Sequence, residues 1–123
     1  LHIEETFPFR EKDLIDNMIE KLLNEGLDTV IAARKEFRVV WQDNKDEIFK
    51  RIDSGDKPRK YKENMMIGYP GLACITYPEF VRNGRLIGNK VGLYEVDNQL
   101  SFFEVRSKKS VKIAEDFIKL NKN

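Results

Sequence analysis

Two short segments of this 123-residue sequence carry residue types that could bind a small polar ligand. The first segment runs from Glu4 to Arg10, between three strand-like residues and a predicted helix. We therefore expect it at the carboxyl end of a strand, where open α/β sheets bind ligands. Glu4, Thr6 and Arg10 could orient a sugar or an anion there, the arginine through two parallel hydrogen bonds. The alternative is a simple turn that Pro8 fixes, with surface charges around it.

The second segment surrounds Glu104, just before a predicted C-terminal helix. Glu104 supplies one carboxylate that could ligate Mg²⁺ through oxygen, although such sites usually use more than one carboxylate. Arg106, Lys108 and Lys109 crowd the start of the helix, where cations oppose the helix dipole. These cations either bind an anion or are tolerated without a role.

The densest basic run, from Lys57 to Lys62, contains Tyr61 among its cations. Such a mixture of cations and an aromatic ring is typical of proteins that bind single-stranded nucleic acid. Acidic residues flank the run, however, at Asp53, Asp56 and Glu63. This favours a solvated surface loop, with an anion-binding loop as the alternative.

Other recognisable chemistry is missing from the sequence. It contains no Gly-x-Gly-x-x-Gly, no phosphate-loop lysine motif and no Cys-x-x-Cys pair. His2 has no neighbouring partner for a nucleophilic site, and we expect it to be structural or exposed. Cys74 lies in an apolar stretch and is predicted to be a buried, inert thiol. No catalytic residue is assigned on this basis.

Composition excludes several classes of protein. Lys and Arg number 22 against 21 Asp and Glu, so the net charge of +1 gives no reason to expect a nucleic-acid partner. The chain is 41% hydrophobic and 35% charged, and no run approaches the ~20 apolar residues of a membrane-spanning helix. The single cysteine favours a reducing, cytoplasmic setting. The length suits one domain.

The apolar pattern predicts a layered α/β domain. Asp13 can cap a helix whose apolar stripe runs from Leu14 to Leu23, and Gly26 can end that helix in the left-handed conformation. A buried strand is predicted next, over 29–33. The other expected elements are a weak strand (37–41), a short helix (47–52), a turn (65–71), strands over 72–76, 91–96 and 101–105, a short helix from Pro78 and a helix from Ser107.

These motifs, taken in order, resemble the acylneuraminate cytidylyltransferases (CMP-sialic acid synthetases) and their relatives that act on 3-deoxy-manno-octulosonate. Glu4 to Arg10 is similar to the family's Gln/Glu-Pro-Thr-Ser/Tyr-Pro-Leu/Phe-Arg segment, and Asp16 resembles the end of its Leu-Ile-Asp. Gly26 to Val30 is similar to Gly-x-Asp-Ser/Thr-Val. A Pro-x-x-Tyr-x-Glu-Asn spacing is carried by Pro58, Tyr61, Glu63 and Asn64.

The resemblance implies a three-layer α/β/α sandwich of the nucleotide-diphospho-sugar transferase type, present as a partial domain. Residues 1–123 are then a single domain that resembles the C-terminal, sugar-side half of such an enzyme. The family carries its CTP loop upstream of the first motif, and this sequence begins at Leu1 without a methionine. We therefore expect the chain to be a piece of a longer protein, to be inactive alone and to form a homodimer.

The implied reaction is attack of an acidic sugar's hydroxyl on the α-phosphate of CTP, with Mg²⁺ offsetting charge as pyrophosphate leaves. The resemblance makes Glu104 a metal ligand, but Arg106 falls where the family has a second aspartate. The alternative is a non-catalytic binding or assembly module in surface-polysaccharide synthesis. Arg51 and Arg59 are candidates to replace a family arginine that would fall on Ser54, so the implied substrate-binding residues are Glu4, Thr6, Arg10, Arg51, Arg59 and Asn64.

Overall fold

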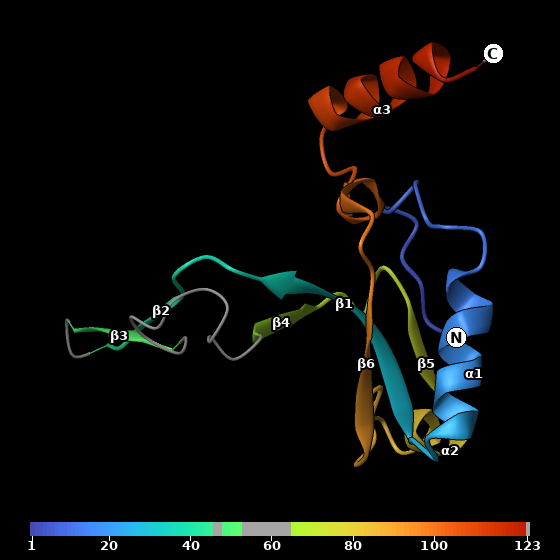
Figure 1. The fold of residues 1–123 in the computed structure, drawn as a ribbon, viewed down its shortest axis with the longest axis vertical. Coiled ribbons are helices and arrows are strands. Elements are labelled where there is room, and N and C mark those ends of the chain that lie inside the picture. Colours follow the sequence, from blue (N-terminus) through green and yellow to red (C-terminus); the bar gives the residue numbers. More distant parts are fainter. Residues whose placement is uncertain (46–47, 53–64, 123) are drawn as a thin grey trace. The chain divides into compact units, whose positions relative to one another are not determined.

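The chain is mixed α/β in a computed structural model that describes residues 1–45, 48–52 and 65–122 (Figure 1). Its contacts divide it into two compact units. The first unit comprises Leu1–Ala33 and Gly68–Asn123, and the second comprises Arg34–Ile67. The mixed α/β class is confirmed, whereas the single domain and the three-layer sandwich stay predictions.

Strand β1 (Thr29–Glu36) is the central strand of a four-stranded sheet. It pairs in antiparallel fashion with β5 (Cys74–Thr76) and in parallel with β6 (Val91–Glu95), and β4 (Met65–Gly68) is its remaining neighbour. The predicted strand over 29–33 is confirmed and extends three residues further. A run of small and β-branched residues suits this place because residues 29–33 are all buried.

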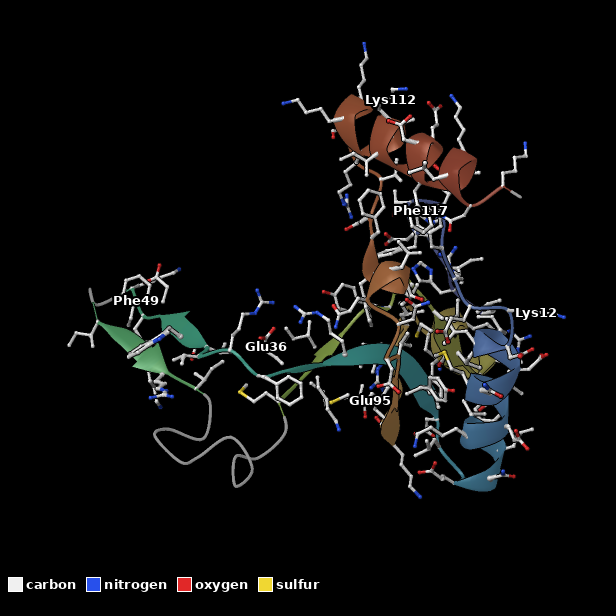
Figure 2. All side chains as sticks on the ribbon, turned by 45° about the horizontal axis from the view of Figure 1, so that its top comes forward. Lys12, Glu36, Phe49, Glu95, Lys112 and Phe117 are labelled. Atoms are coloured by element: carbon white, nitrogen blue, oxygen red, sulfur yellow. The ribbon has the colours of Figure 1, made fainter. Side chains whose placement is uncertain are left out.

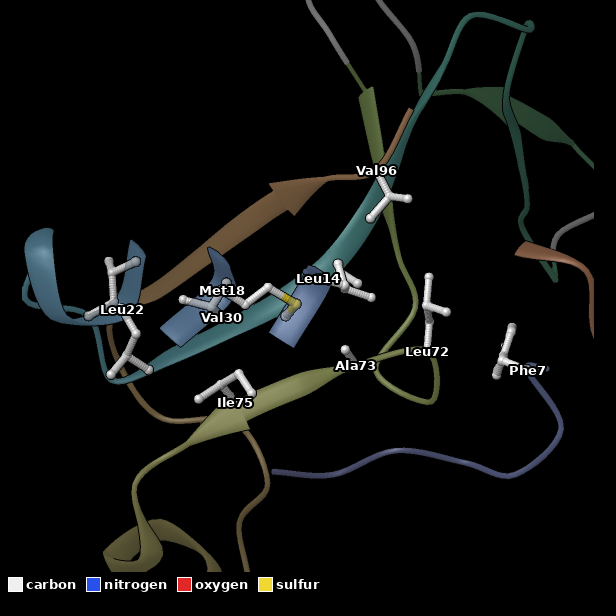
Figure 3. Close-up of a cluster of buried hydrophobic side chains, with 11 residues drawn as sticks. Phe7, Leu14, Met18, Leu22, Val30, Leu72, Ala73, Ile75 and Val96 are labelled. Atoms are coloured by element: carbon white, nitrogen blue, oxygen red, sulfur yellow. The ribbon is translucent and has the colours of Figure 1, made fainter. Parts of the chain in front are cut away.

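Helix α1 (Leu14–Asn24) packs on β5 and β6 (Figure 1). Its stripe residues Leu14, Met18 and Leu22 are buried, as the helical spacing predicts. They meet Val30 of β1 and Ile75 of β5, which face each other across the ladder (Figure 3). The core of the first unit therefore lies between α1 and this face of the sheet.

Of the two predictions for the ends of α1, one is confirmed and the other is not. Gly26 has a φ of +60°, so the left-handed turn that glycine favours is confirmed. Asp13 occupies the N-cap position, but its carboxylate makes no capping hydrogen bond. Its backbone is not in the extended conformation that usually aims a cap side chain at the first turn.

The C-terminal part of the first unit contains two helices and a short 3₁₀ turn. Helix α2 (Pro78–Arg82) begins at proline as predicted, and α3 (Lys108–Leu120) begins after the Ser107 N-cap. The predicted strand over 101–105 is wrong, because η2 (Gln99–Phe102) is 3₁₀ and no strand follows it. Phe9, Phe103 and Phe117 form an aromatic cluster that packs α3 against the N-terminal segment.

The second unit contains a small antiparallel hairpin of β2 (Trp41–Asp43) and β3 (Phe49–Arg51). The predicted strand over 37–41 is wrong except at Trp41, where β2 begins. The predicted helix over 47–52 is wrong in its described part, which contains β3. The predicted turn over 65–71 begins instead with β4. Local periodicity is weak in all three places, so pairing with another strand decides the conformation.

Candidate functional site

Arg10 binds the main chain of two loops in the first unit. Its Nε donates to the Leu72 carbonyl at 2.6 Å and its Nη1 to the Phe7 carbonyl at 2.8 Å. Its Nη2 donates to the Gly71 carbonyl at 3.0 Å and also to the Glu4 carbonyl. Four of the five guanidinium N–H donors are therefore used within the protein. Arg10 is a positioning residue that ties the Glu4–Arg10 segment to the loop before β5.

The electrostatics of Arg10 fit that structural role. Burial lowers the pKa of the Arg10 guanidinium, and the nearby Glu4 carboxylate partly opposes this effect by raising it. The Glu4 amide also donates to the Gly71 carbonyl at 2.7 Å, which fixes the same junction from the main chain. The expected bidentate contact of Arg10 with a ligand is thus replaced by contacts with carbonyl groups.

Glu4, Thr6, Glu104 and Arg106 come together in space, and we call them the Glu104 cluster. The Val105 amide donates to the Thr6 carbonyl at 2.7 Å, which joins segments from the two ends of the chain. The Thr6 hydroxyl donates to Glu104 Oε1 at 3.4 Å, and the Arg106 guanidinium forms an ion pair with the same oxygen. The sequence-predicted residues of the two segments are therefore brought together.

Arg106 lies between the two carboxylates of the cluster. Its Nη2 atom is 3.9 Å from Glu4 Oε2 in addition to its contact with Glu104. The hydrogen bond and the negative charge of Glu104 raise the pKa of Arg106, and the Glu4 charge adds to this effect. The Arg106 side chain is 68% exposed and that of Glu104 is 28% exposed, so water screens this attraction.

An open hollow of about 410 Å³ adjoins the cluster. It is lined by Thr6, Val105, Arg106, Ser107, Lys108 and Val111. Arg106 and Lys108 supply positive charge, and the hydroxyl groups of Thr6 and Ser107 can donate or accept hydrogen bonds. The arrangement suits a ligand with a negative charge and hydroxyl groups.

The first turn of α3 already satisfies part of its own backbone. Ser107 Oγ accepts from the Ser110 amide at 3.2 Å, and Ser110 Oγ accepts from the Ser107 amide at 2.8 Å. Ser110 Oγ also accepts from the Arg106 amide at 2.9 Å. This reciprocal capping anchors the backbone of Arg106 at the edge of the hollow.

The Glu104 cluster does not fit the magnesium ion that the family resemblance implies. Glu104 Oε1 is already bound by the Thr6 hydroxyl and the Arg106 guanidinium. Across residues 1–45, 48–52 and 65–122, no group of three or more His, Cys, Asp or Glu side chains is arranged to hold a metal ion. Mg²⁺ prefers several oxygen ligands, and here a cation of the protein lies at the carboxylates instead.

Of the remaining predicted substrate-binding residues, the structure describes Arg51. Arg51 lies in β3 of the second unit, whereas the cluster belongs to the first unit. Arg59 and Asn64 lie outside the described residues, as does the basic run over 57–62. Cys74 is fully buried, and burial raises the pKa of its thiol, as expected for an inert residue.

Sequence reasoning missed the roles of Gly71 and Ser110. A Cβ at Gly71 would lie 2.6 Å from Glu4 Cδ, so the Glu4 side chain requires glycine beneath it or must shift. The Pro70-Gly71 pair marks this turn in the sequence, but only tertiary structure shows that the Glu4 side chain lies over the glycine. Ser110 is three residues after Ser107, which is the spacing of a capping box with serine in the acidic position.

A second hollow in the first unit, of about 460 Å³, has its own set of lining residues, one of which, His2, has its Nε2 4.0 Å from Glu4 Oε1 of the cluster. Its lining is mainly apolar, from residues such as Pro78, Val81 and Leu86, and it includes the charged or titratable side chains of His2 and Arg82. It is somewhat larger than the hollow beside Arg106, but it brings no carboxylate and few hydrogen-bonding groups together. We therefore place the candidate site at the Glu104 cluster.

Comparison with known proteins adds no assignment. No protein-family model matches the chain, and no curated protein matches it significantly. In the described residues, no helix is both long enough and apolar enough to cross a membrane. A functional assignment therefore depends on the residues of the first unit and on their geometry.

Proposed function

We propose that this chain is the sugar-side part of a nucleotidyltransferase that activates an acidic, sialic-acid-like sugar by transferring CMP from CTP. The Glu104 cluster supports this proposal, because residues 98 positions apart, Thr6 and Glu104, share a hydrogen bond at the edge of the hollow. An acidic sugar carries one carboxylate and several hydroxyl groups. The cluster and the hollow offer cations for the former and carboxylate or hydroxyl oxygens for the latter.

In the proposed reaction a sugar hydroxyl oxygen attacks the α-phosphorus of CTP. A new oxygen–phosphorus bond forms, the bond to the leaving pyrophosphate breaks, and the hydroxyl proton passes to water. The contribution of this chain is to hold and orient the sugar, with Glu4 and Thr6 at the hydroxyl groups and Arg106 at the carboxylate. Orientation of this kind raises the rate by placing the reacting atoms in attack geometry.

Several finer features belong to the same proposal. They are a three-layer sandwich of the nucleotide-diphospho-sugar transferase type, a homodimer and a cytoplasmic setting. The buried, unpaired thiol of Cys74 is compatible with a reducing compartment. CTP is the second substrate, and the resemblance assigns its binding loop to sequence upstream of Leu1.

Binding of the sugar can be tested on this chain directly. Saturation-transfer NMR with N-acetylneuraminic acid is expected to show binding, whereas the uncharged N-acetylmannosamine is expected to bind at least about tenfold more weakly. Arg106→Ala should weaken binding of the acid by on the order of tenfold, because a charge-assisted pair is lost. Arg85→Ala, at an exposed arginine of the same unit, is the matched control and should leave binding unchanged. Equal binding of both sugars would contradict the proposal.

Transfer of CMP is tested on the longer protein that the family resemblance implies. Pyrophosphate release from CTP should depend on an acidic sugar, and a panel of nonulosonic acids would identify the substrate. A folded protein that releases no pyrophosphate with any member of the panel would rule out the enzyme.

The second candidate is a non-catalytic module that binds a surface-polysaccharide precursor. The position of Arg106 between Glu4 and Glu104 favours it, because a fixed cation lies where the resemblance implies a metal ligand. Binding of an acidic sugar without any pyrophosphate release from CTP would select this candidate over the enzyme.

A further inference from the structure

The Glu104 cluster holds two carboxylates and one guanidinium in a single network. Glu104 Oε1 accepts from the Thr6 hydroxyl at 3.4 Å and pairs with Arg106 Nη2. The same nitrogen lies 3.9 Å from Glu4 Oε2. The guanidinium therefore interacts with both carboxylates at once, as a bridging metal ion would.

The backbone keeps Arg106 at this place. Its amide donates to Ser110 Oγ at 2.9 Å, and the preceding residue, Val105, is fixed by its 2.7 Å hydrogen bond to the Thr6 carbonyl. Both anchors are independent of the side-chain charges. Because the Arg106 backbone is held next to the two carboxylates, the side chain loses less conformational entropy when its ion pairs form.

A metal ion at Glu104 would meet this cation directly. It would have to displace the guanidinium from Oε1 or lie beside a positive charge, and both alternatives oppose binding. Among the described residues, the acidic side chains near Arg106 are Glu4 and Glu104, and they provide too few oxygen atoms for a dedicated Mg²⁺ site.

We infer that the Arg106 guanidinium takes the place of a divalent cation in the Glu104 cluster, so that this site works without a bound metal ion. The inference goes beyond the proposed function and holds whether or not the ligand is an acidic sugar. It makes Arg106 a built-in counter-charge for Glu4 and Glu104. It also predicts that removal of this charge, with a carboxylate in its place, creates a site for a divalent ion.

The test uses Mn²⁺ alone as the probe, with binding measured by water proton relaxation on the full 123-residue chain. The wild-type chain should show weak binding that Glu104→Gln leaves unchanged. Arg106→Asp should bind Mn²⁺ on the order of tenfold more tightly, because a third carboxylate joins the cluster and the cation is lost. Glu104→Gln in the Arg106→Asp background should abolish the gain.

Arg85→Asp is the matched control, because it makes the same change of charge at an exposed arginine of the first unit that pairs with Asn89. It should give no tighter binding of Mn²⁺. Circular dichroism checks that each variant folds, and Arg106→Gln, which removes the charge alone, should give a smaller gain if Arg106→Asp does not fold. Tight wild-type binding that Glu104→Gln abolishes would overturn the inference, as would a folded Arg106→Asp or Arg106→Gln without any gain. No sugar or nucleotide is present, so these results are separate from any failure of the proposed function.

Discussion

The two compact units of this chain keep their described residues in place by different means. The first unit buries a continuous apolar cluster between α1 and the sheet (Figure 3). In the described part of the second unit, the buried residue is a carboxylate, Glu36, whose side chain is 5% exposed. By contrast, the large apolar side chains of Ile48 and Phe49 in the second unit are 70% and 62% exposed (Phe49 and Glu36 are labelled in Figure 2).

Glu36 is held by arginines rather than by apolar contacts. Its Oε1 accepts from Arg38 Nε at 2.8 Å and from the Arg38 amide at 2.9 Å, and its Oε2 accepts from Arg34 Nη1 at 2.9 Å. Burial of a carboxylate costs free energy unless the group is paired with a cation and hydrogen-bonded. Glu36 has both, since two guanidinium groups and a backbone amide donate to it. Apolar burial therefore stabilises the first unit, whereas ion pairs and hydrogen bonds hold the first residues of the second unit, from Arg34 to Arg38.

The largest expected effect is a truncation in the core of the first unit. Leu14→Ala should lower the free energy of unfolding by about 2–5 kcal/mol, because the side chain is 1% exposed and its loss leaves a cavity. Ile48→Ala in the second unit is the matched control and should change it by less than about 0.5 kcal/mol. Urea unfolding followed by circular dichroism measures both, and equal losses would contradict the contrast between the units.

Acid should act on the second unit through Glu36. Hydrogen bonds from the Arg38 side chain and backbone lower the pKa of Glu36 from 4.5 to about 2, although burial opposes the shift. A lowered folded-state pKa stabilises the folded form above pH 4.5, and this stabilisation is lost as the pH falls from 4.5 through about 2. Thermal unfolding followed by Trp41 fluorescence should therefore show an acid limb, since Trp41 is the one tryptophan in the sequence.

Glu36→Gln is the test of that assignment. The variant keeps the size of the side chain but does not titrate, so the part of the acid limb between pH 4.5 and 2 should flatten. Glu25→Gln, at an exposed glutamate of the first unit, should leave the limb seen by Trp41 unchanged. An unaltered acid limb in Glu36→Gln would show that other groups control it.

A smaller effect is expected at the helix caps of the first unit. Ser107→Ala should cost about 1 kcal/mol, because Ser107 Oγ accepts from the Ser110 amide at the start of α3. Asp13→Ala should cost less, because Asp13 makes no capping hydrogen bond at the start of α1. Urea unfolding measures both variants, and a larger loss of unfolding free energy in Asp13→Ala would contradict this difference between the two caps.

The smallest effect is expected at an exposed ion pair of α3. Lys112 Nζ lies 3.0 Å from Asp116 Oδ1, one helical turn away, and this hydrogen bond raises the pKa of Lys112. Lys112→Ala should change the free energy of unfolding less than either cap substitution does, because water screens exposed pairs. A loss as large as that of Leu14→Ala would remove the distinction between core and surface in the first unit.

Elements with strong local patterns could be predicted from the sequence, whereas weakly patterned ones could not. The stripe of α1, the apolar run of β1 and the turn at Gly26 are each encoded in the types and spacing of residues close in the chain. The strand expected over 101–105 failed because η2 is 3₁₀, which satisfies its backbone locally without a partner strand. Phe49 to Arg51 became a strand because β2 pairs with it, and that pairing is invisible to periodicity.

The candidate site shows the same division. Glu4, Thr6 and Glu104 could be selected from residue type and order, because carboxylate and hydroxyl oxygens at element ends are typical of binding sites. The role of Arg10 could not, because a guanidinium can bind either a ligand or main-chain carbonyl groups with the same geometry. Only the fold places the carbonyl groups of Leu72 and Gly71 within its reach.

The sequence by itself determined the amphipathic helix, the buried central strand and the residue types from which the site is made, since these depend on local spacing and side-chain chemistry. Tertiary structure alone decided that Arg106 lies between Glu4 and Glu104 and that Arg10 turns toward the backbone. Apart from the pair of Arg106 with Glu104, which are neighbours in sequence, those contacts join residues roughly 60 to 100 positions apart in the chain. The backbone hydrogen bond from Val105 to Thr6 joins the two ends of the chain and so brings these side chains within reach of one another.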